Sequence, residues 1–224
     1  MELHEMEDKI MNLEQKVVLL EDLEAIKRLQ RAYGYYIEHW MYEELTDCFA
    51  DNPDTFLQIS AGLYIGKEGV RRYFSGEKTR SADPEVLHQV MQLSGIVDIV
   101  EEGKRAEGRW YGFGLVALPQ GNGIVERIFD GIYNVKYVKE RGVWKILQIS
   151  WNPIFYAAPN EGWVKPERKN TIVGAPINPA PHPDKPQGLG TLYPSGYIPP
   201  FHFRHPVTGK ETPSNKYKLV QGNS

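Results

Sequence analysis

The hydrophobic period of this chain changes at one point, and that change limits the possible folds more than any other feature. Up to residue 50, apolar residues recur every three or four positions, which is typical of helices. The turn sequence "DNPD" at residues 51–54 stops this pattern, and the runs that follow are rich in β-branched and aromatic residues. We therefore predict an α+β fold in which N-terminal helices pack on one face of a curved antiparallel sheet.

The helical part is predicted to contain three segments. The first carries an apolar stripe whose spacing alternates between four and three residues, the period of a coiled-coil seam. Its members are Met6, Ile10, Leu13, Val17 and Leu20. With fewer than three heptads, the stripe could pair with another helix or fold back onto its own domain. The period shifts at Leu23, which predicts a second helical stretch as far as Trp40, and a short third helix covers residues 42–50.

Five strands are predicted after the turn, with a short helix at residues 66–74 between the first and the second. The strands cover residues 55–60, 87–100, 104–118, 124–140 and 142–151. The connection "ERG" between the last two is short enough to require an antiparallel pair. "EEGK" and "PQGNG" are predicted to be hairpin turns as well.

The length and the proline distribution predict one main domain with two appendages. A chain of 224 residues, 41% of them hydrophobic and 12% aromatic, can bury one good core. Of its 16 prolines, 13 lie from Pro153 onward, a density that no regular element tolerates. We predict a helical extension (1–20), a main domain (21–152) and an extended arm (153–224). The arm is rich in aromatic residues, which favours an ordered segment on its own domain or on a neighbouring subunit over a disordered tail.

Charge and cysteine content exclude several classes of function. The net charge is -3, from 26 basic and 29 acidic residues, and no basic cluster indicates a nucleic-acid partner. Cys48 is the single cysteine, which excludes an intramolecular disulfide and fits a cytoplasmic protein. The N-terminus is charged throughout and lacks the pattern of a secretory signal. Since no apolar run approaches ~20 residues, we expect no membrane-spanning segment.

Several of these segments, in this order and spacing, resemble SnoaL-like proteins of the nuclear transport factor 2 superfamily. They are "LEAIKRLQRAYGYYIEHWMYEELTDCFAD", "GLYIGKEGVRRYF", "LHQVMQLSGIVDIV" and "FDGIYNVKYVKERGVWKILQISW", within residues 20–152. The resemblance implies a cone of helices and a bent sheet that encloses a deep pocket. It leaves the reaction open, because the superfamily contains dehydratases, isomerases, dehydrochlorinases, cyclases, dioxygenase small subunits and non-catalytic binding domains.

The resemblance also implies a catalytic set of Tyr33, Glu38 and His88, similar to that of scytalone dehydratase and bile-acid dehydratase. Those enzymes carry aspartate where this chain has Glu38, which moves the carboxylate by one methylene. A carboxylate beside an imidazole makes the histidine a usable base, and a phenol can donate to a leaving hydroxyl. Each residue also has a structural interpretation: Tyr33 in the core, Glu38 solvated on the helix, and His88 paired with a turn.

Aromatic and basic residues in the same region are candidates for binding a substrate. We expect Trp40, Tyr111 and Tyr133 to form part of an aromatic pocket wall. Arginine in mid-strand must reach solvent or a partner, which applies to Arg109 and Arg127. Because side chains alternate between the two faces of a strand, Arg127 is expected on the same face of the sheet as Tyr133. There it could hold an anionic or phenolic oxygen of a substrate or join an interior ion pair.

No cofactor or metal is expected from the sequence. We find no phosphate-binding glycine loop, dinucleotide fingerprint or nucleophile elbow. His202 and His205 in "HFRH" have a spacing seen in metal sites, and His182 is in the same arm, but no patterned acid or cysteine completes a ligand set.

Together these features favour a cofactor-independent lyase that acts on a hydroxylated aromatic or polycyclic small molecule. The leaving group could be water or a small carbonyl such as formaldehyde. The alternatives are an isomerase with the same base, a non-catalytic ligand-binding domain, and the small subunit of a ring-hydroxylating oxygenase. Apolar surface on the first helix and on the arm favours a homodimer or homotrimer.

Overall fold

The computed structural model describes residues 3–75, 86–120, 123–164, 182–186 and 198–213. Its helices are α1 (Leu3–Glu38), α2 (Tyr42–Asp47), α3 (Gly66–Ser75) and the single 3-10 turn η1 (Glu101–Gly103). Its strands are β1 (Phe56–Ile59), β2 (Gly62–Ile65), β3 (Leu87–Val100), β4 (Arg105–Gln120), β5 (Gly123–Glu140), β6 (Val143–Ala157) and β7 (Lys185–Pro186). The predicted hairpin at "PQGNG" is confirmed, because β4 and β5 pair antiparallel up to Gln120 and Gly123; residues 121–122 and much of the predicted arm lie outside the described residues.

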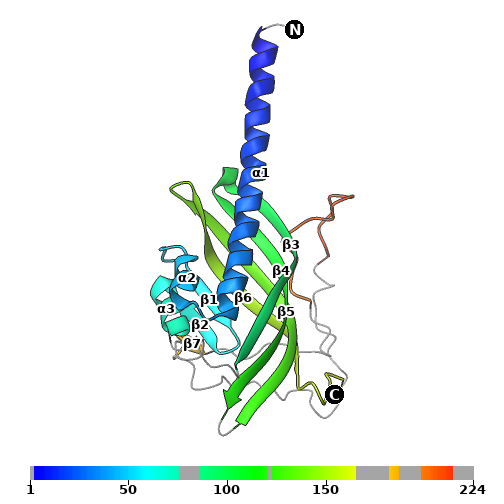
Figure 1. Cartoon of the computed structure of the whole chain (residues 1–224). Coiled ribbons are helices and arrows are strands. Elements are labelled where there is room, and N and C mark those ends of the chain that lie inside the picture. The colour runs from blue at the N-terminus through cyan, green and yellow to red at the C-terminus, as the bar shows by residue number, and fades with distance from the viewer. Residues whose placement is uncertain (1–2, 76–85, 121–122, 165–181, 187–197, 214–224) are drawn as a thin grey trace.

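The described strands form one curved sheet in the order β3-β4-β5-β6-β1-β2-β7, with the helices against it (Figure 1). This confirms the predicted α+β architecture. The turn at Arg141 and Gly142, both with positive φ, joins β5 and β6 into the predicted antiparallel pair. One pairing differs from the all-antiparallel prediction, because β1 runs parallel to β6. The short strand β2, which pairs antiparallel with β1, was not predicted.

Helix α1 is a single element of 36 residues, where the sequence predicted two segments. The change of apolar phase near Leu23 marks the point where the helix meets the sheet, and the helix continues through it. Residues 3–20 are exposed and project beyond the sheet (Figure 1), and we call them the stem. From there the buried positions of α1 are Asp22, Ile26, Gln30, Tyr33, Gly34 and Ile37.

A buried carboxylate fixes α1 to the sheet where the stem ends. Asp22 accepts hydrogen bonds from Lys139 Nζ at 2.7 and 3.0 Å and from Trp144 Nε1 at 2.8 Å. Both donors belong to the β5–β6 hairpin. These bonds satisfy a carboxylate that is almost completely removed from water, so they define where the helix begins to pack.

The core lies between the helices and the inner face of the sheet, the face that α1 covers. Large rings on this face lie over glycines on neighbouring strands. A Cβ atom on Gly112 would lie 2.6 Å, and one on Gly131 2.4 Å, from the Trp151 ring. Only glycine leaves room for that ring, which explains the glycines between aromatic residues in β4 and β5.

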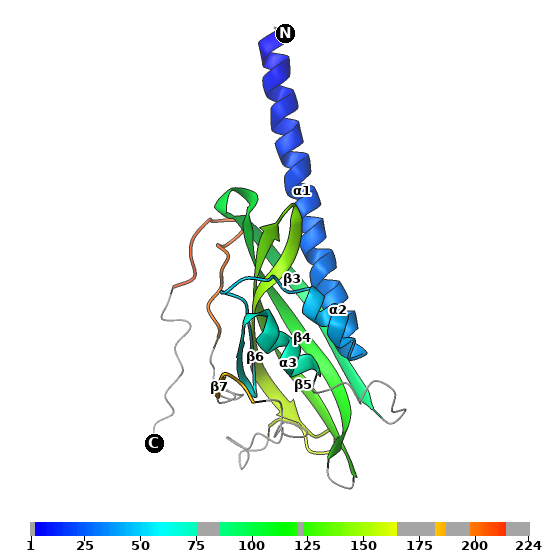
Figure 2. The same ribbon diagram turned by 90° about the vertical axis from the view of Figure 1, so that its left-hand side faces the viewer.

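Two described pieces of the arm contact the body (Figure 2). The Asp184 carboxylate accepts hydrogen bonds from Ile65 N and Arg72 Nη2 at 2.8 and 2.7 Å, beside the short β2–β7 pair. On the outer face, Arg109 Nη1 donates to the carbonyls of Pro199 and Pro200 at 3.0 and 3.1 Å. Among the described helices, none is long and apolar enough to span a membrane.

Candidate functional site

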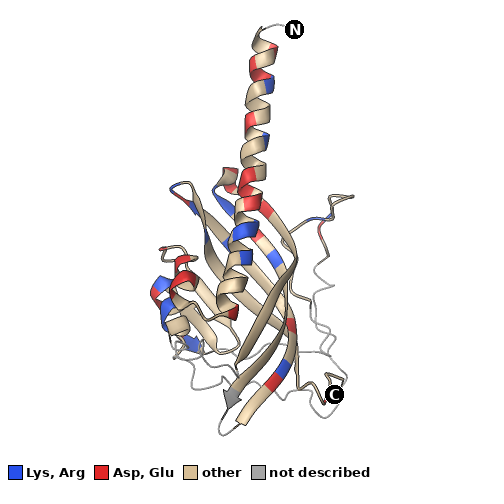
Figure 3. Ribbon diagram, in the orientation of Figure 1, with Lys and Arg blue, Asp and Glu red and all other residues tan. Residues whose placement is uncertain are grey.

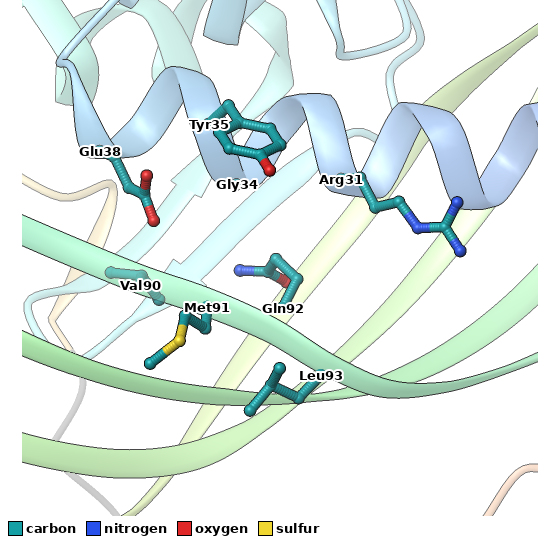
Figure 4. Close-up of a pocket in the computed structure, with 8 residues that line it drawn as sticks. All are labelled: Arg31, Gly34, Tyr35, Glu38, Val90, Met91, Gln92 and Leu93. Atoms are coloured by element: carbon teal, nitrogen blue, oxygen red, sulfur yellow. The ribbon is translucent and has the colours of Figure 1, made fainter.

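The last two turns of α1 lie against the first half of β3, and a glycine makes this close approach possible. A Cβ atom on Gly34 would lie 2.8 Å from Cγ of Gln92. Between the two elements is a groove of about 210 Å³, lined by residues 90–93 of β3 and by four residues of α1, which are Arg31, Gly34, Tyr35 and Glu38. The Glu38 carboxylate points toward β3 across this groove (Figure 4).

His88 lies at the start of β3 and its ring is oriented by the end of α1. Its Nδ1 lies 3.2 Å from the carbonyl oxygen of Ile37. A carbonyl can only accept, so Nδ1 carries the proton and donates, and Nε2 is the basic nitrogen of the neutral ring. The Trp40 ring packs against the imidazole with 4.4 Å between ring centroids. The structure therefore holds the His88 ring in a defined orientation.

Glu38 is the next residue after Ile37 in the chain, so it lies near the contact between Ile37 and His88. The Ile37 carbonyl accepts from His88, and the half-buried carboxylate of Glu38 lines the α1–β3 groove. The sequence predicted that a carboxylate would fix the tautomer of the imidazole. In the structure a main-chain carbonyl performs that orientation.

Tyr33 is almost completely buried, with 1% of its surface exposed, one helical turn before Ile37. Its ring packs edge-on against Phe49 and Phe74, with centroid distances of 6.1 and 6.4 Å. Burial raises the pKa of Tyr33 well above its usual value, and the neighbouring Tyr133 hydroxyl adds to the rise. A phenol with such a pKa keeps its proton at neutral pH and acts as a hydrogen-bond donor.

Tyr133 occupies the inner face of β5, close to Tyr33. Burial raises its pKa above the usual value, the Tyr156 hydroxyl adds to the rise, and the Gln92 amide partly offsets it. Its ring packs against Trp151 in a tilted arrangement, with 4.4 Å between ring centroids. Trp151 Nε1 in turn donates to the Tyr156 hydroxyl at 2.9 Å. The predicted wall residue Tyr133 thus belongs to a cluster of buried, protonated phenols.

A chain of polar side chains connects this cluster to the far side of the core. Trp110 Nε1 donates to the Tyr137 hydroxyl at 3.0 Å, and that hydroxyl donates to Gln30 Oε1 at 2.8 Å. Gln30 Nε2 then donates to Gln92 Oε1 at 2.8 Å. Gln30 and Gln92 were not predicted from the sequence as members of the site. One signal was available, because Gln30 is a polar residue within the apolar helical stripe of Ile26 and Tyr33.

The structure does not bring every predicted site residue together. Tyr111 lies on the outer face of β4 with 45% of its surface exposed, because neighbours in a strand alternate and Trp110 points inward. Arg109 is also on the outer face, against the arm. Arg127 follows the inner alternation of β5, and its Nη1 donates to the carbonyl of Glu126 at 2.6 Å.

The histidines of the arm have separate partners. His202 Nε2 lies 3.4 Å from an Asp98 oxygen, and burial lowers the pKa of this histidine. His205 Nδ1 accepts from the backbone of Val207 and Thr208. Among the residues that the structure describes, no group of three or more potential ligands is arranged to hold a metal.

Comparison with known proteins points to one family. The family profile described as SnoaL-like domain matches residues 18–149. A putative scytalone dehydratase from Novosphingobium aromaticivorans is 19% identical with a TM-score of 0.54, over 70% of this chain and 99% of that one. The hexachlorocyclohexane dehydrochlorinase LinA-type3 from Novosphingobium barchaimii is 15% identical with a TM-score of 0.52, over 67% and 99%.

A third solved structure is a putative aromatic ring hydroxylase from Novosphingobium aromaticivorans. It is 19% identical with a TM-score of 0.52, over 62% of this chain and 94% of that one. At these identities the three likenesses establish a shared fold. No curated protein matches the chain.

Proposed function

Since the chain belongs to the SnoaL-like domain family, we propose that it is a cofactor-independent lyase acting on a hydroxylated aromatic or polycyclic small molecule. The observation that carries this proposal is His88, whose Nδ1 proton is directed to the Ile37 carbonyl so that Nε2 is the basic nitrogen. Tyr33, one helical turn before Ile37, and Tyr133, close to Tyr33, are buried phenols on the inner side of the fold. A base and a proton donor are the minimum set for an elimination.

The elimination of water uses His88 as the base and a tyrosine as the proton donor. His88 Nε2 takes a proton from the carbon next to the one that carries the hydroxyl group. The electrons of that C–H bond form the double bond as the C–O bond breaks. A tyrosine hydroxyl donates a proton to the leaving oxygen, which departs as water. Tyr33 is the candidate donor, because it is the inward-facing tyrosine one helical turn before Ile37, whose carbonyl orients His88.

Loss of a small carbonyl needs the same groups in a different order. His88 takes the proton of a primary hydroxyl group, a C–C bond breaks, and formaldehyde leaves. The electrons of that bond stay on the remaining carbon, which then takes a proton from a tyrosine hydroxyl. We propose both branches for one site because the base and the donors are common to them.

The other predicted site residues have supporting roles in this proposal. The Glu38 carboxylate, in the groove next to Ile37, stabilises the imidazolium that forms on His88. Trp40 and Tyr133 supply aromatic walls for an apolar substrate. Arg127, on the inner alternation of β5, binds an anionic or phenolic oxygen of that substrate.

The names of two structural neighbours support an elimination. A dehydratase and a dehydrochlorinase both remove a small molecule from a substrate, and both structures share the fold of this chain. We therefore favour a lyase over an isomerase, although both reactions use the same base.

The test is turnover of a panel of hydroxylated aromatic compounds by the wild-type chain and by His88→Ala. We expect His88→Ala to lower kcat by roughly two to four orders of magnitude, the usual effect of a lost general base. His39→Ala is the matched control, because His39 is exposed beside Glu38, and it should keep the wild-type rate. Chelation should leave the rate unchanged.

Two results would contradict the proposal. If the wild type binds aromatic compounds but converts none of them, the chain is a binding domain. If His88→Ala keeps the wild-type rate on a converted substrate, another residue is the base. Product analysis separates the lyase from the isomerase, since only the lyase releases water or formaldehyde.

A further inference from the structure

The stem of α1 carries an apolar stripe that faces solvent. Its six side chains have exposed fractions between 42% and 75%. They are Leu3, Met6, Ile10, Leu13, Val17 and Leu20. A continuous apolar row of this length on a projecting helix is typical of a surface that binds another helix.

The stripe faces away from the body of its own chain. Asp22, which is bound to β5 and β6, lies about 140° around the helix from Val17 and about 160° from Leu20. The opposite side of the stem, with Met11 and Val18, faces the β3–β4 turn across a hollow of about 610 Å³. The side of the stem that faces its own domain is therefore the side with Met11 and Val18. The stripe remains exposed to solvent.

The residue types along the stripe fit a parallel pair of helices. In heptad notation Ile10 and Val17 occupy a positions, and Leu13 and Leu20 occupy d positions. β-branched residues at a with leucine at d favour parallel two-stranded coiled coils.

The charges beside the stripe specify the same orientation. Lys9 and Lys16 occupy g positions, and Glu14 and Glu21 occupy e positions, along the stem of mixed charge in Figure 3. In a parallel pair each g residue lies beside the e residue of the next heptad on the other helix. Lys9 then meets Glu14, and Lys16 meets Glu21. An antiparallel pair would place lysine beside lysine and glutamate beside glutamate.

We propose that residues 3–23 form a parallel, in-register, two-stranded coiled coil with a second copy of this chain. The seam ends there because the next a and d positions are Glu24, Lys27 and Arg31, and Arg31 pairs with Glu24 of its own helix at 3.1 Å. The two bodies then lie at the same end of the coil, each on the outer side of its own helix. This inference does not depend on the proposed function.

The first test measures the mass of the full chain by sedimentation equilibrium, for the wild type and for two charge-reversed variants. Lys9→Glu with Lys16→Glu makes positions 9, 14, 16 and 21 all acidic, and Glu14→Lys with Glu21→Lys makes the same four positions all basic. We expect a wild-type dimer, at least about tenfold weaker self-association of each variant, and a restored dimer when the variants are mixed. A monomeric or trimeric wild type, or variants that self-associate as tightly as the wild type, would overturn the proposal.

The second test measures orientation by disulfide formation. A parallel, in-register pair places each seam residue opposite itself, so Leu20→Cys should form an interchain disulfide rapidly under mild oxidation. Asp8→Cys, at an outward f position of the same stem, is the matched control and should react slowly. The wild-type chain gives the background from the buried Cys48. Equal cross-linking of both variants, or none at Leu20→Cys, would overturn the parallel arrangement.

Discussion

Gln30 is completely buried in α1, and its side chain holds two other polar groups in the core. It accepts from the Tyr137 hydroxyl and donates to Gln92. Gln30→Leu keeps a similar volume but leaves the buried Tyr137 hydroxyl and the half-buried Gln92 amide oxygen without their partner. We expect it to lower the free energy of unfolding by about 1–3 kcal/mol, measured by urea titration. Gln15→Leu, at an exposed position of the same helix, should change it by less than about 0.5 kcal/mol.

A substitution at Tyr33 can separate the role of its ring in packing from the proposed role of its hydroxyl in catalysis. Tyr33→Phe keeps the ring between Phe49 and Phe74 and removes the proposed proton donor. We expect kcat to fall by roughly two orders of magnitude, with substrate affinity unchanged. Steady-state kinetics on the substrate found in the panel checks this. Tyr111→Phe is the control, because Tyr111 lies on the outer face of the sheet with 45% of its surface exposed, and an equal loss there would show that the effect is not specific to Tyr33.

Sequence spacing predicted the positions of the candidate residues better than it predicted their contacts. The helical stripe placed Tyr33 on the inner side of α1, where it is buried. It could not show that the Ile37 carbonyl orients His88, because that contact joins residues 51 positions apart. Which of Trp110 and Tyr111 points inward depends on the register of β4 in the sheet, so strand propensity alone left both possible.

At the scale of elements, Asp22 separates two parts of α1. Before it, the stem is exposed, and after it the helix packs on the sheet. Asp22→Ala removes the acceptor of Lys139 Nζ and Trp144 Nε1, and the indole N–H is then buried without a partner. We expect the free energy of unfolding to fall by about 2–4 kcal/mol in a urea titration.

Control variants of Asp22 identify the origin of that loss. Trp144→Phe removes the indole N–H together with one of the two fused rings. The packing cost of that loss cancels in the double-mutant cycle, so Asp22→Ala should cost less in that background than in the wild type. Equal costs in both backgrounds would show that the bond between Asp22 and Trp144 contributes nothing to the anchor.

The short strands are the elements that sequence alone does not specify. The long runs that became β3 to β6 were predicted because each has many β-branched and aromatic residues in succession. β2 has four residues and depends on its pairing with β1. β1 runs parallel to β6, about 90 residues later in the chain, and no turn between them reveals that direction.

β7 is held by a carboxylate, which makes its attachment dependent on pH. The Ile65 N–H bond, with the help of Arg72, holds the pKa of Asp184 below its usual range. A carboxyl group with a lowered pKa stabilises the folded state above its unfolded pKa of about 3.9, and that stabilisation is lost as the pH falls through the lower folded value. We expect the NMR shift of the Ile65 amide to change with a midpoint below 3.9, and Asp184→Asn to abolish this titration.

On the scale of the whole molecule, the stem and the arm extend the family fold in different ways. The profile match covers residues 18–149, so most of the stem and all described arm residues lie outside it. The stem projects away from the body, whereas residues 198–203 of the arm lie across the outer face of the sheet (Figures 1 and 2). The inner face, with the candidate site, belongs to the shared fold. The parts of this chain outside the family match are therefore its two ends.

The attachment of the arm to the outer face depends on Arg109. Its Nη1 donates to two successive carbonyls, of Pro199 and Pro200, and its guanidinium lies 4.7 Å from the centre of the Phe201 ring. Arg109→Met keeps most of the side-chain length but removes the charge and the donors. We expect residues 198–203 to detach, with hydrogen exchange at Phe201 to Phe203 at least about tenfold faster.

Global unfolding should change little in Arg109→Met, because the sheet forms its own pairings beneath the arm. His202→Ala is the matched comparison, since His202 also contacts the body, through Asp98 at 3.4 Å. Arg109 makes two hydrogen bonds with a charged donor, whereas His202 makes one contact and burial lowers its pKa. His202→Ala should therefore accelerate hydrogen exchange less than Arg109→Met. If exchange is faster in His202→Ala than in Arg109→Met, the histidine and not the arginine holds the arm.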